Sequence, residues 1–370
     1  MSMAISRTPY RLSLFGGGTD YHTWYQEHGA AILSATIDHY CYLSCRLLPP
    51  FFKHKSRIVW SQIEEITSHE AIQHPAVKAV LKYLNLHQGV EIHHQGGLPA
   101  RSGLGSSSAF IVGLLHALYA LLGEISSKRE LACEAIHIER HLLKENVGVQ
   151  DQIATAYGGL NKIIILPNGH FEVTPLVLPH KRLQTLQEHL LLFFTGTSRT
   201  ASEIAGEKIK AIPNKKQELQ SMQKMVEEAA QLLATQHPIT DLGELLHDNW
   251  MLKRQISEKI APAFIDHIYE RARQAGAIGG KLMGAGGGGF MLFFVKPENK
   301  LAVCEALKDL LLVPFQFDNT GSQIIFYDNM QYSQMSMVRR DYRHLQDQTA
   351  SPLATTPIQR ERLNKLLAIE

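Results

Sequence analysis

The sequence predicts a protein of two domains in which strands and helices are mixed. At 370 residues the chain is longer than one hydrophobic core usually fills. Apolar and polar residues alternate along several stretches of the first half, as in half-buried strands, whereas helical periodicity dominates residues 202–274. We therefore expect an N-terminal domain over residues 1–180, a C-terminal domain over 181–330, and a partly flexible extension over 331–370.

In the first half, glycine, proline and changes of period delimit the expected elements. Pro167, Asn168, Gly169 and His170 form a good hairpin turn between two apolar runs. The expected strands span residues 10–15, 31–36, 40–46, 57–66, 90–94, 160–166 and 171–178. The expected helices span residues 110–122 and 128–144, and a further short helix starts near residue 151.

The second half begins after a basic segment at residues 179–187, where we expect the domain boundary. Pro213 and Pro238 interrupt its helical pattern. The expected helices span residues 202–211, 217–235, 241–257, 263–274 and 300–312. The expected strands span residues 190–195, 290–295 and 322–327.

Composition excludes several classes of protein. The formal charge of +2 gives no electrostatic reason to bind nucleic acid, and no stretch reaches the roughly 18 apolar residues of a membrane span. Four cysteines without a CxxC pair suggest neither a disulfide scaffold nor zinc. The sequence therefore predicts a cytoplasmic enzyme that binds small molecules, with no nucleic-acid or membrane partner.

A loop rich in glycine and serine lies between the strand at 90–94 and the apolar helix at 110–122. Gly103 and Gly105 allow a ligand to approach the backbone, and three serines stand beside the free N–H groups of the first helical turn. This arrangement favours a phosphate site, although an ordinary connection with a serine cap is the alternative. The nucleotide-binding candidates are Pro99, Arg101, Ser102, Gly103, Leu104, Gly105, Ser106, Ser107 and Ser108.

Phosphoryl transfer from a nucleotide also requires a metal ligand, a cation near the phosphate and a carboxylate for the acceptor hydroxyl. The chain offers Glu139 with a loop serine, Arg11 and Asp151 for these roles. A solvated edge arginine is the alternative for Arg11, and a helix cap is the alternative for Asp151. Asp20, which follows Gly16–Gly18 and Thr19, is either a ligand-facing residue or a turn residue.

A second glycine run, residues 284–289, satisfies G-x-G-x-x-G. It leads into the expected strand at 290–295 rather than opening a helix, so it is not a dinucleotide fingerprint. We expect its backbone to pass very close to a ligand or to another loop, with a purely structural turn as the alternative.

The three glycine-containing motifs, at 7–21, 99–109 and 284–288, resemble those of the GHMP small-molecule kinases in composition, order and separation. Within that superfamily, residues 7–21, 101–110, 147–152 and 195–201 are similar to the bacterial D-glycero-D-manno-heptose 7-phosphate kinases. The resemblance covers roughly residues 4 to 327. It implies an α+β protein with an N-terminal domain like ribosomal protein S5 domain 2, a C-terminal GHMP domain, and an active site in the cleft between them.

The resemblance also implies roles for individual residues. Asp151 matches the catalytic aspartate, Glu139 and Ser107 match the magnesium ligands, and Arg11 stands near the reacting phosphate. ATP and Mg²⁺ are therefore the expected co-substrate and cofactor. The implied substrate-binding residues are Asp20, Gly17, Gly18, Thr19, Arg199, Gly286 and Gly287.

The expected reaction is phosphorylation of the anomeric hydroxyl of D-glycero-D-manno-heptose 7-phosphate. Such an acceptor needs a second phosphate anchor, for which Arg199 is the first candidate, with Arg101 or the cluster Lys53, Lys55 and Arg57 as alternatives. The other functions considered are a kinase for a neutral sugar such as fucose, a kinase for an isoprenoid or amino-acid alcohol, and a non-catalytic sugar sensor. A homodimer is the one protein assembly that we consider.

Overall fold

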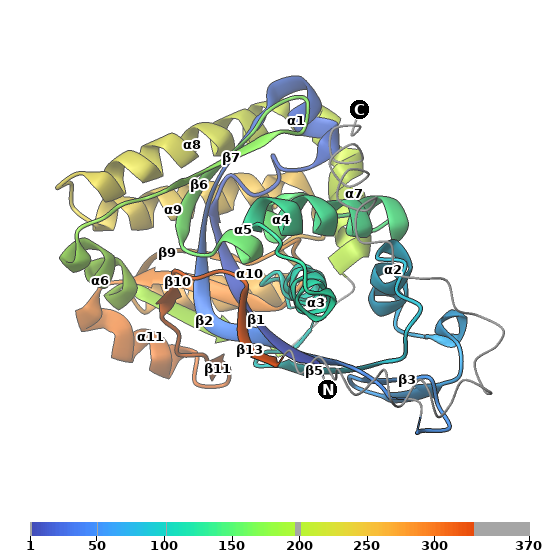
Figure 1. Cartoon of the computed structure of the whole chain (residues 1–370). Helices are drawn as coiled ribbons and strands as arrows, with labels where there is room; N and C mark the ends of the chain where they lie inside the picture. The colour runs from blue at the N-terminus through green and yellow to red at the C-terminus, as the bar shows by residue number, and fades with distance from the viewer. Residues whose placement is uncertain (1, 50, 101, 197–200, 329–370) are drawn as a thin grey trace.

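The computed structural model describes residues 2–49, 51–100, 102–196 and 201–328 (Figure 1). The predicted extension at 331–370 and two predicted site residues, Arg101 and Arg199, lie outside these ranges. Within them, the strands form two sheets, as the mixed pattern of the sequence predicts. None of the described helices combines the length and apolar character that a membrane crossing requires.

The larger sheet has nine strands, and its main path runs β13-β1-β2-β5-β3-β4. Two further strands, β6 and β12, pair with β2, and β7 pairs with β6 to form the predicted hairpin. The stretches expected as two strands at 31–36 and 40–46 form one long strand, because β1 pairs along nearly its whole length. The strands are β1 (Met3–Phe15), β2 (Ala30–Leu47), β3 (Ser56–Val59), β4 (Ile63–Ile66), β5 (Val90–Gly96), β6 (Leu160–Ile165), β7 (Phe171–Pro175), β12 (Phe317–Asp318) and β13 (Gln323–Asp328).

The helix α3 (Ser106–Leu122) packs against β1 and β2. It is apolar on nearly every face because other helices cover the sides that the sheet does not. Figure 1 shows α3, α4 and α5 on one side of β1 and β2, with α8 and α9 on the other. The other helices of the first half are α1 (His22–His28), α2 (Pro75–Tyr83), α4 (Lys128–His137) and α5 (Gln150–Tyr157), with short turns η1 (His69–Ala71) and η2 (Ile138–Leu142).

The smaller sheet has the order β11-β8-β10-β9. Its two inner strands are almost entirely apolar, because helices or the larger sheet's core cover both of their faces. The strands are β8 (Leu190–Phe194), β9 (Ala277–Leu282), β10 (Phe290–Val295) and β11 (Leu311–Leu312). The helices are α6 (His180–Glu188), α7 (Ala201–Ala211), α8 (Lys216–Ala234), α9 (Thr240–Ile256), α10 (Ala263–Gln274) and α11 (Lys300–Ala306), with turns η3 (Ile212–Asn214) and η4 (Pro297–Asn299).

The two halves of the chain are closely interlocked. One hydrophobic cluster extends from the larger sheet to one face of β8 and β10, through residues such as Leu192 and Phe294. The segment at 179–187, where the sequence predicts a boundary, lies largely in α6, and β12 and β13 return to the larger sheet. The domain limits at 180 and 330 therefore stay predictions.

Candidate active site

Arg11 lies in the middle of β1 and connects two segments that are far apart in the sequence. Its Nε and Nη2 donate to the two carboxylate oxygens of Asp151 at 2.8 and 2.6 Å. Its Nη1 donates to the carbonyl oxygen of Gly103 at 2.6 Å, and its backbone N–H donates to Leu104 O. The side chain is only 2% exposed. The alternative of a solvated edge arginine is therefore wrong.

Asp151 is the second residue of α5, and its side chain points to Arg11 rather than to the helix backbone. Val149 occupies the N-cap position and makes no side-chain cap hydrogen bond, so the cap interpretation of Asp151 is wrong. The carboxylate is 26% exposed. A planar guanidinium that binds both oxygens fixes the orientation of the carboxylate, while the exposed part remains available to a ligand.

The serine-rich loop brings its backbone against Arg11. Gly105 is the N-cap of α3 in the left-handed region at φ +74°, and a side chain there would meet Arg11 Cγ at 3.0 Å. No side chain caps α3, so the serine-cap alternative is also wrong. Ser102 Oγ instead donates to the carbonyl oxygen of Pro99 at 2.7 Å. The N-terminus of this long helix therefore carries backbone N–H groups that suit an anion.

The second glycine run passes against the serine loop, as the sequence predicts. A side chain on Gly284 would come within 2.5 Å of Gly103 Cα, and one on Gly289 would overlap the carbonyl oxygen of Ser102. The middle of the run, Gly286 and Gly287, lies against Ile260 instead. The ends of this run, rather than its middle, contact the serine loop.

The buried ammonium of Lys253 holds the start of the same glycine run. Its Nζ donates to the carbonyl oxygens of Leu282 and Gly284 at 2.7 and 2.8 Å. Lys281 links the two sheets directly, because its buried Nζ donates to Leu14 O at 2.8 Å. The bond from Lys281 fixes β9 of the smaller sheet to β1 of the larger one.

Asp20 connects the first glycine loop with α5. Its Oδ1 accepts from Gly18 N at 2.9 Å, and its Oδ2 accepts from Gln150 N at 3.4 Å. Any side chain at Gly148 would overlap this carboxylate, so glycine is required there. Thr19 Oγ1 donates to the carbonyl oxygen of Gly16, which closes the turn. The turn role of Asp20 is therefore present, and its role in substrate binding stays a prediction.

Glu139 lies in η2, a π-helical turn that interrupts the helix expected over 128–144. Its carboxylate is buried and accepts one bifurcated hydrogen bond from Ser108 Oγ, which lies 2.9 and 3.1 Å from the two oxygens, and another from Gln152 Nε2. Burial raises the pKa of Glu139 to about 8, although the hydrogen bonds from Gln152 and Ser108 oppose the shift. Ser107, the serine expected beside Glu139, is exposed, and Ser108 is the serine that contacts this carboxylate.

Several residues of this region were not expected from the sequence. Gln150 and Gln152 flank Asp151 in the chain, which is the one signal that could have singled them out. The contact of Ser108 with Glu139 depends on the direction of each side chain around two different helices, which no spacing reveals. The residues that were not expected at the site are Gly148, Gln150, Gln152 and Lys253, whereas Ser108 was expected only as a nucleotide-binding residue.

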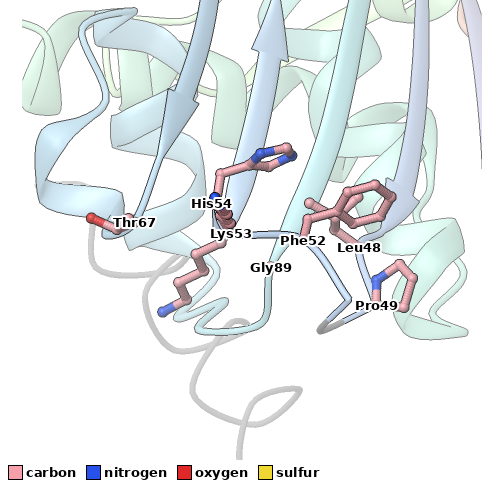
Figure 2. A pocket seen from close by; sticks show the side chains of 8 residues that line it. Leu48, Pro49, Phe52, Lys53, His54, Thr67 and Gly89 are labelled. Carbon is pink, nitrogen blue, oxygen red and sulfur yellow. The ribbon is translucent and has the colours of Figure 1, made fainter.

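The basic cluster Lys53, Lys55 and Arg57 lies far from Arg11. Across the larger sheet, Arg57 is in the same row as Met3, which is eight residues from Arg11 along β1. At the usual rise of a strand, this separation is roughly 25 Å. Lys53 and Lys55 line a cavity of about 320 Å³ at that end of the sheet (Figure 2), and no other predicted site residue lines it. This alternative for the phosphate anchor is therefore wrong.

Two protein domain families match parts of this chain. Residues 71–159, which include the serine loop, Glu139 and Asp151, match the GHMP kinases N-terminal domain. Residues 225–311, which include the second glycine run, match the GHMP kinases C-terminal domain. The serine loop and the second glycine run therefore lie inside matched regions, whereas the first glycine loop, Gly16–Gly18, lies outside them.

Individual proteins are similar over most of the chain. The D-glycero-alpha-D-manno-heptose 7-phosphate kinase of Campylobacter jejuni is 29% identical over 324 residues, which cover 83% of this chain and 94% of that protein. The structure of a D-glycero-D-manno-heptose 1-phosphate kinase from Bacteroides thetaiotaomicron is 26% identical, with a TM-score of 0.71, over 87% of this chain and 98% of that one. The mevalonate kinase of Pyrococcus horikoshii is 28% identical over 63% of this chain and 67% of that protein.

Proposed function

The chain belongs to the GHMP kinases, a family of phosphotransferases, and on this premise we propose that it transfers the γ-phosphoryl group of ATP to the anomeric hydroxyl of D-glycero-D-manno-heptose 7-phosphate. The product is heptose 1,7-bisphosphate, an intermediate for nucleotide-activated heptose and surface polysaccharide. Similarity to two proteins named as heptose phosphate kinases supports the choice of sugar. The observation that carries the chemistry is the contact of Arg11 with both Asp151 and the serine loop.

In this proposal, Asp151 accepts the proton of the attacking hydroxyl. Arg11 holds both carboxylate oxygens of Asp151, so the base keeps one orientation toward the acceptor. The same guanidinium holds Gly103 O in the nucleotide loop, which couples the position of the base to the position of the donor. The positive charge of Arg11 also offsets negative charge that develops on the transferred group.

The nucleotide phosphates lie against the serine loop in this proposal. The first turn of α3 offers its backbone N–H groups and the positive end of its dipole, and Ser106 and Ser107 add hydroxyl groups. The contact between Gly103 and Gly284 fixes the loop from the other side. The nucleotide-binding residues that we propose within the described part of the chain are Pro99, Ser102, Gly103, Leu104, Gly105, Ser106, Ser107 and Ser108.

Magnesium fits the group around Glu139. A carboxylate, a serine hydroxyl and an amide oxygen are ligands that Mg²⁺ prefers, and nucleotide phosphates and water complete such sites. The Oε1 atom of Gln152 is buried and has no hydrogen-bond partner among the described residues, which is the state expected of an atom that awaits a ligand. Bound Mg²⁺ would neutralise charge on the β- and γ-phosphates. Glu139 and Ser108 would hold it, with Gln152 beside them.

The acceptor is proposed to bind between the first glycine loop and α5. Asp20 connects these two segments, and Gly17, Gly18 and Thr19 form the loop itself. Gly286 and Gly287 are kept as proposed substrate contacts. Arg199 is kept as the proposed anchor for the acceptor's own phosphate. The cytoplasmic location and the homodimer likewise stay predictions.

Phosphorus NMR of the reaction product tests this function. The protein is incubated with ATP, Mg²⁺ and heptose 7-phosphate, and the expected product carries a second phosphate that couples to the anomeric proton. Asp151→Asn is the control for contaminating kinases. A new phosphate at another carbon, or transfer to fucose, mevalonate or homoserine but not to the heptose phosphate, would contradict the proposed substrate.

A further inference from the structure

Besides Gln152 Oε1, two buried polar groups near Arg11 and Asp151 in the chain have no hydrogen-bond partner among the described residues. Ser13 Oγ and Gln150 Oε1 are inaccessible to solvent and make no hydrogen bond among the described residues, and their residues are only 5% and 8% exposed. Leaving such a group unpaired in a protein interior costs about 1–3 kcal/mol. An alanine and a leucine would avoid this cost, so packing alone does not explain a serine and a glutamine here.

The positions of the two residues relate them to the reaction. Ser13 follows Arg11 by two residues along β1, so both side chains lie on the same face of the strand. Gln150 immediately precedes Asp151, and its backbone N–H is bound to Asp20. Both orphaned groups therefore belong to the segments that carry the proposed base and the proposed acceptor site.

Gly17 lies between the two side chains. A Cβ atom at this position would be 2.8 Å from Ser13 Oγ and 3.7 Å from Gln150 Nε2. Its neighbours Gly16 and Gly18 have φ values of +77° and +114°, which only glycine adopts at low cost. The bare backbone of this glycine loop therefore lies against Ser13 Oγ and the side-chain amide group of Gln150.

We propose that Ser13 and Gln150 form a specificity pair that binds hydroxyl groups of the acceptor, after a shift of the Gly16–Gly18 loop. The inference rests on the proposed function, because it requires a polyhydroxylated acceptor at Asp151. Gln150 Oε1 accepts a hydrogen bond from one hydroxyl, and Ser13 Oγ donates to or accepts from another. An acceptor with hydroxyls close to the reacting one satisfies both groups, whereas an acceptor with an apolar surface there leaves them unpaired.

Ser13→Ala and Gln150→Leu test the pair. Each variant should lower kcat/KM for the acceptor about tenfold, through KM, and leave KM for ATP unchanged. Each should also leave the melting temperature of the ligand-free protein unchanged or raise it, because an unsatisfied polar group is removed. If either residue had a purely structural role, its substitution would lower the melting temperature.

Ser34→Ala is the matched control. Ser34 pairs with Ser13 across β1 and β2 and is also buried, but its Oγ donates to Leu12 O at 3.2 Å. We expect this variant to lower the melting temperature and to leave the acceptor KM unchanged. A panel of acceptors that each lack one hydroxyl completes the test. The analogue without the hydroxyl that Gln150 binds should have a lower kcat/KM than the full acceptor with the wild-type enzyme, but not with Gln150→Leu.

The outcomes separate this inference from the proposed substrate. If the wild type rejects heptose 7-phosphate but phosphorylates another polyol, the proposed substrate is wrong. Ser13→Ala and Gln150→Leu are then measured with that polyol as the acceptor. An unchanged acceptor KM in both variants, or a loss of stability as large as that of Ser34→Ala, overturns the specificity pair. If mevalonate or homoserine is the acceptor, or none of the acceptors reacts, both proposals fall.

Discussion

Arg11 and Asp151 are 140 residues apart in the sequence, yet the guanidinium binds both oxygens of the carboxylate. We predict that Asp151→Asn keeps ATP binding within about threefold while it lowers kcat by two or more orders of magnitude, because an amide cannot accept the hydroxyl proton. Calorimetric titration with ATP and steady-state kinetics measure the two effects. A folded Asp151→Asn variant with wild-type kcat would show that Asp151 is not the base.

The serine that contacts Glu139 leads to a second prediction at this scale. Ser108→Ala should raise the Mg²⁺ concentration for half-maximal rate about tenfold, because it removes a hydroxyl from the proposed metal site. Ser107→Ala, at an exposed position of the same helical turn, is the matched control. Titration of the rate with Mg²⁺ distinguishes them, and a larger effect of Ser107→Ala would restore the assignment that the family resemblance implies.

The candidate site shows which residues a sequence can reveal. Arg11 and Asp151 could be singled out because each lies next to a glycine-rich break and has a charge that phosphoryl transfer requires. Ser13 and Gln150 could not, because their significance comes from burial without a partner, which depends on the packing of β1 against α5 and the loop. Ser108 was expected to bind the nucleotide, but its contact with Glu139 could not be predicted, because side-chain direction within a helical turn decides which serine meets this carboxylate.

The two glycine-rich loops form one unit because their backbones touch. Gly284→Ala would place a methyl group against Gly103 Cα, so the serine loop must move. A displacement of about 1 Å in a positioning loop can lower activity about a hundredfold, and we expect a loss of this size in kcat/KM for ATP.

Gly123→Ala is the matched control for this substitution. Gly123 also has a positive φ, +73°, but a Cβ atom there meets nothing within 4 Å. Both variants carry the same backbone strain, so only Gly284→Ala should lose activity. Equal activity of the two variants would show that the contact between the loops does not position the nucleotide.

The return of β13 to the larger sheet involves His116 of α3. Its Nδ1 lies 2.9 Å from Ser322 Oγ, just before β13, and burial lowers the pKa of His116 to about 4 from its usual 6.5. The unfolded chain therefore takes up a proton below pH 6.5 that the folded protein does not. The free energy of unfolding is therefore unaffected by His116 above pH 6.5, and it decreases as the pH falls from 6.5 toward 4.

His116→Gln tests this linkage. Between pH 7 and pH 5, the wild type should lose about 2 kcal/mol of unfolding free energy more than the variant does. Urea unfolding of both proteins at a series of pH values measures the difference. Parallel curves for the two proteins would show that His116 titrates normally in the folded state.

At the level of elements, the hairpin at 160–175 and the apolar helix α3 could be predicted because turn residues and periodicity are local signals. The π-helical turn at Glu139 could not, since the expected helical pattern continues through it. The short β12 and β13 were also beyond prediction as parts of the larger sheet, because strand pairing across almost the whole chain has no local signature.

The whole molecule positions its site through contacts between the two sheets. Lys281 on β9 donates to Leu14 O on β1, and Gly284 lies against Gly103, so Arg11 is held from both halves of the chain. Length and composition predicted two domains but could not predict this junction, because buried lysines and touching glycines acquire their roles only after both sheets have formed.

The choice of acceptor is the central claim about the whole molecule. The most direct measurement compares kcat/KM for heptose 7-phosphate with kcat/KM for unphosphorylated heptose, mannose and fucose. Charge-assisted hydrogen bonds to the second phosphate should favour heptose 7-phosphate by about ten- to a hundredfold. A higher kcat/KM for any neutral sugar would contradict both the phosphate anchor and the proposed substrate, and the assignment to the GHMP kinases would stand.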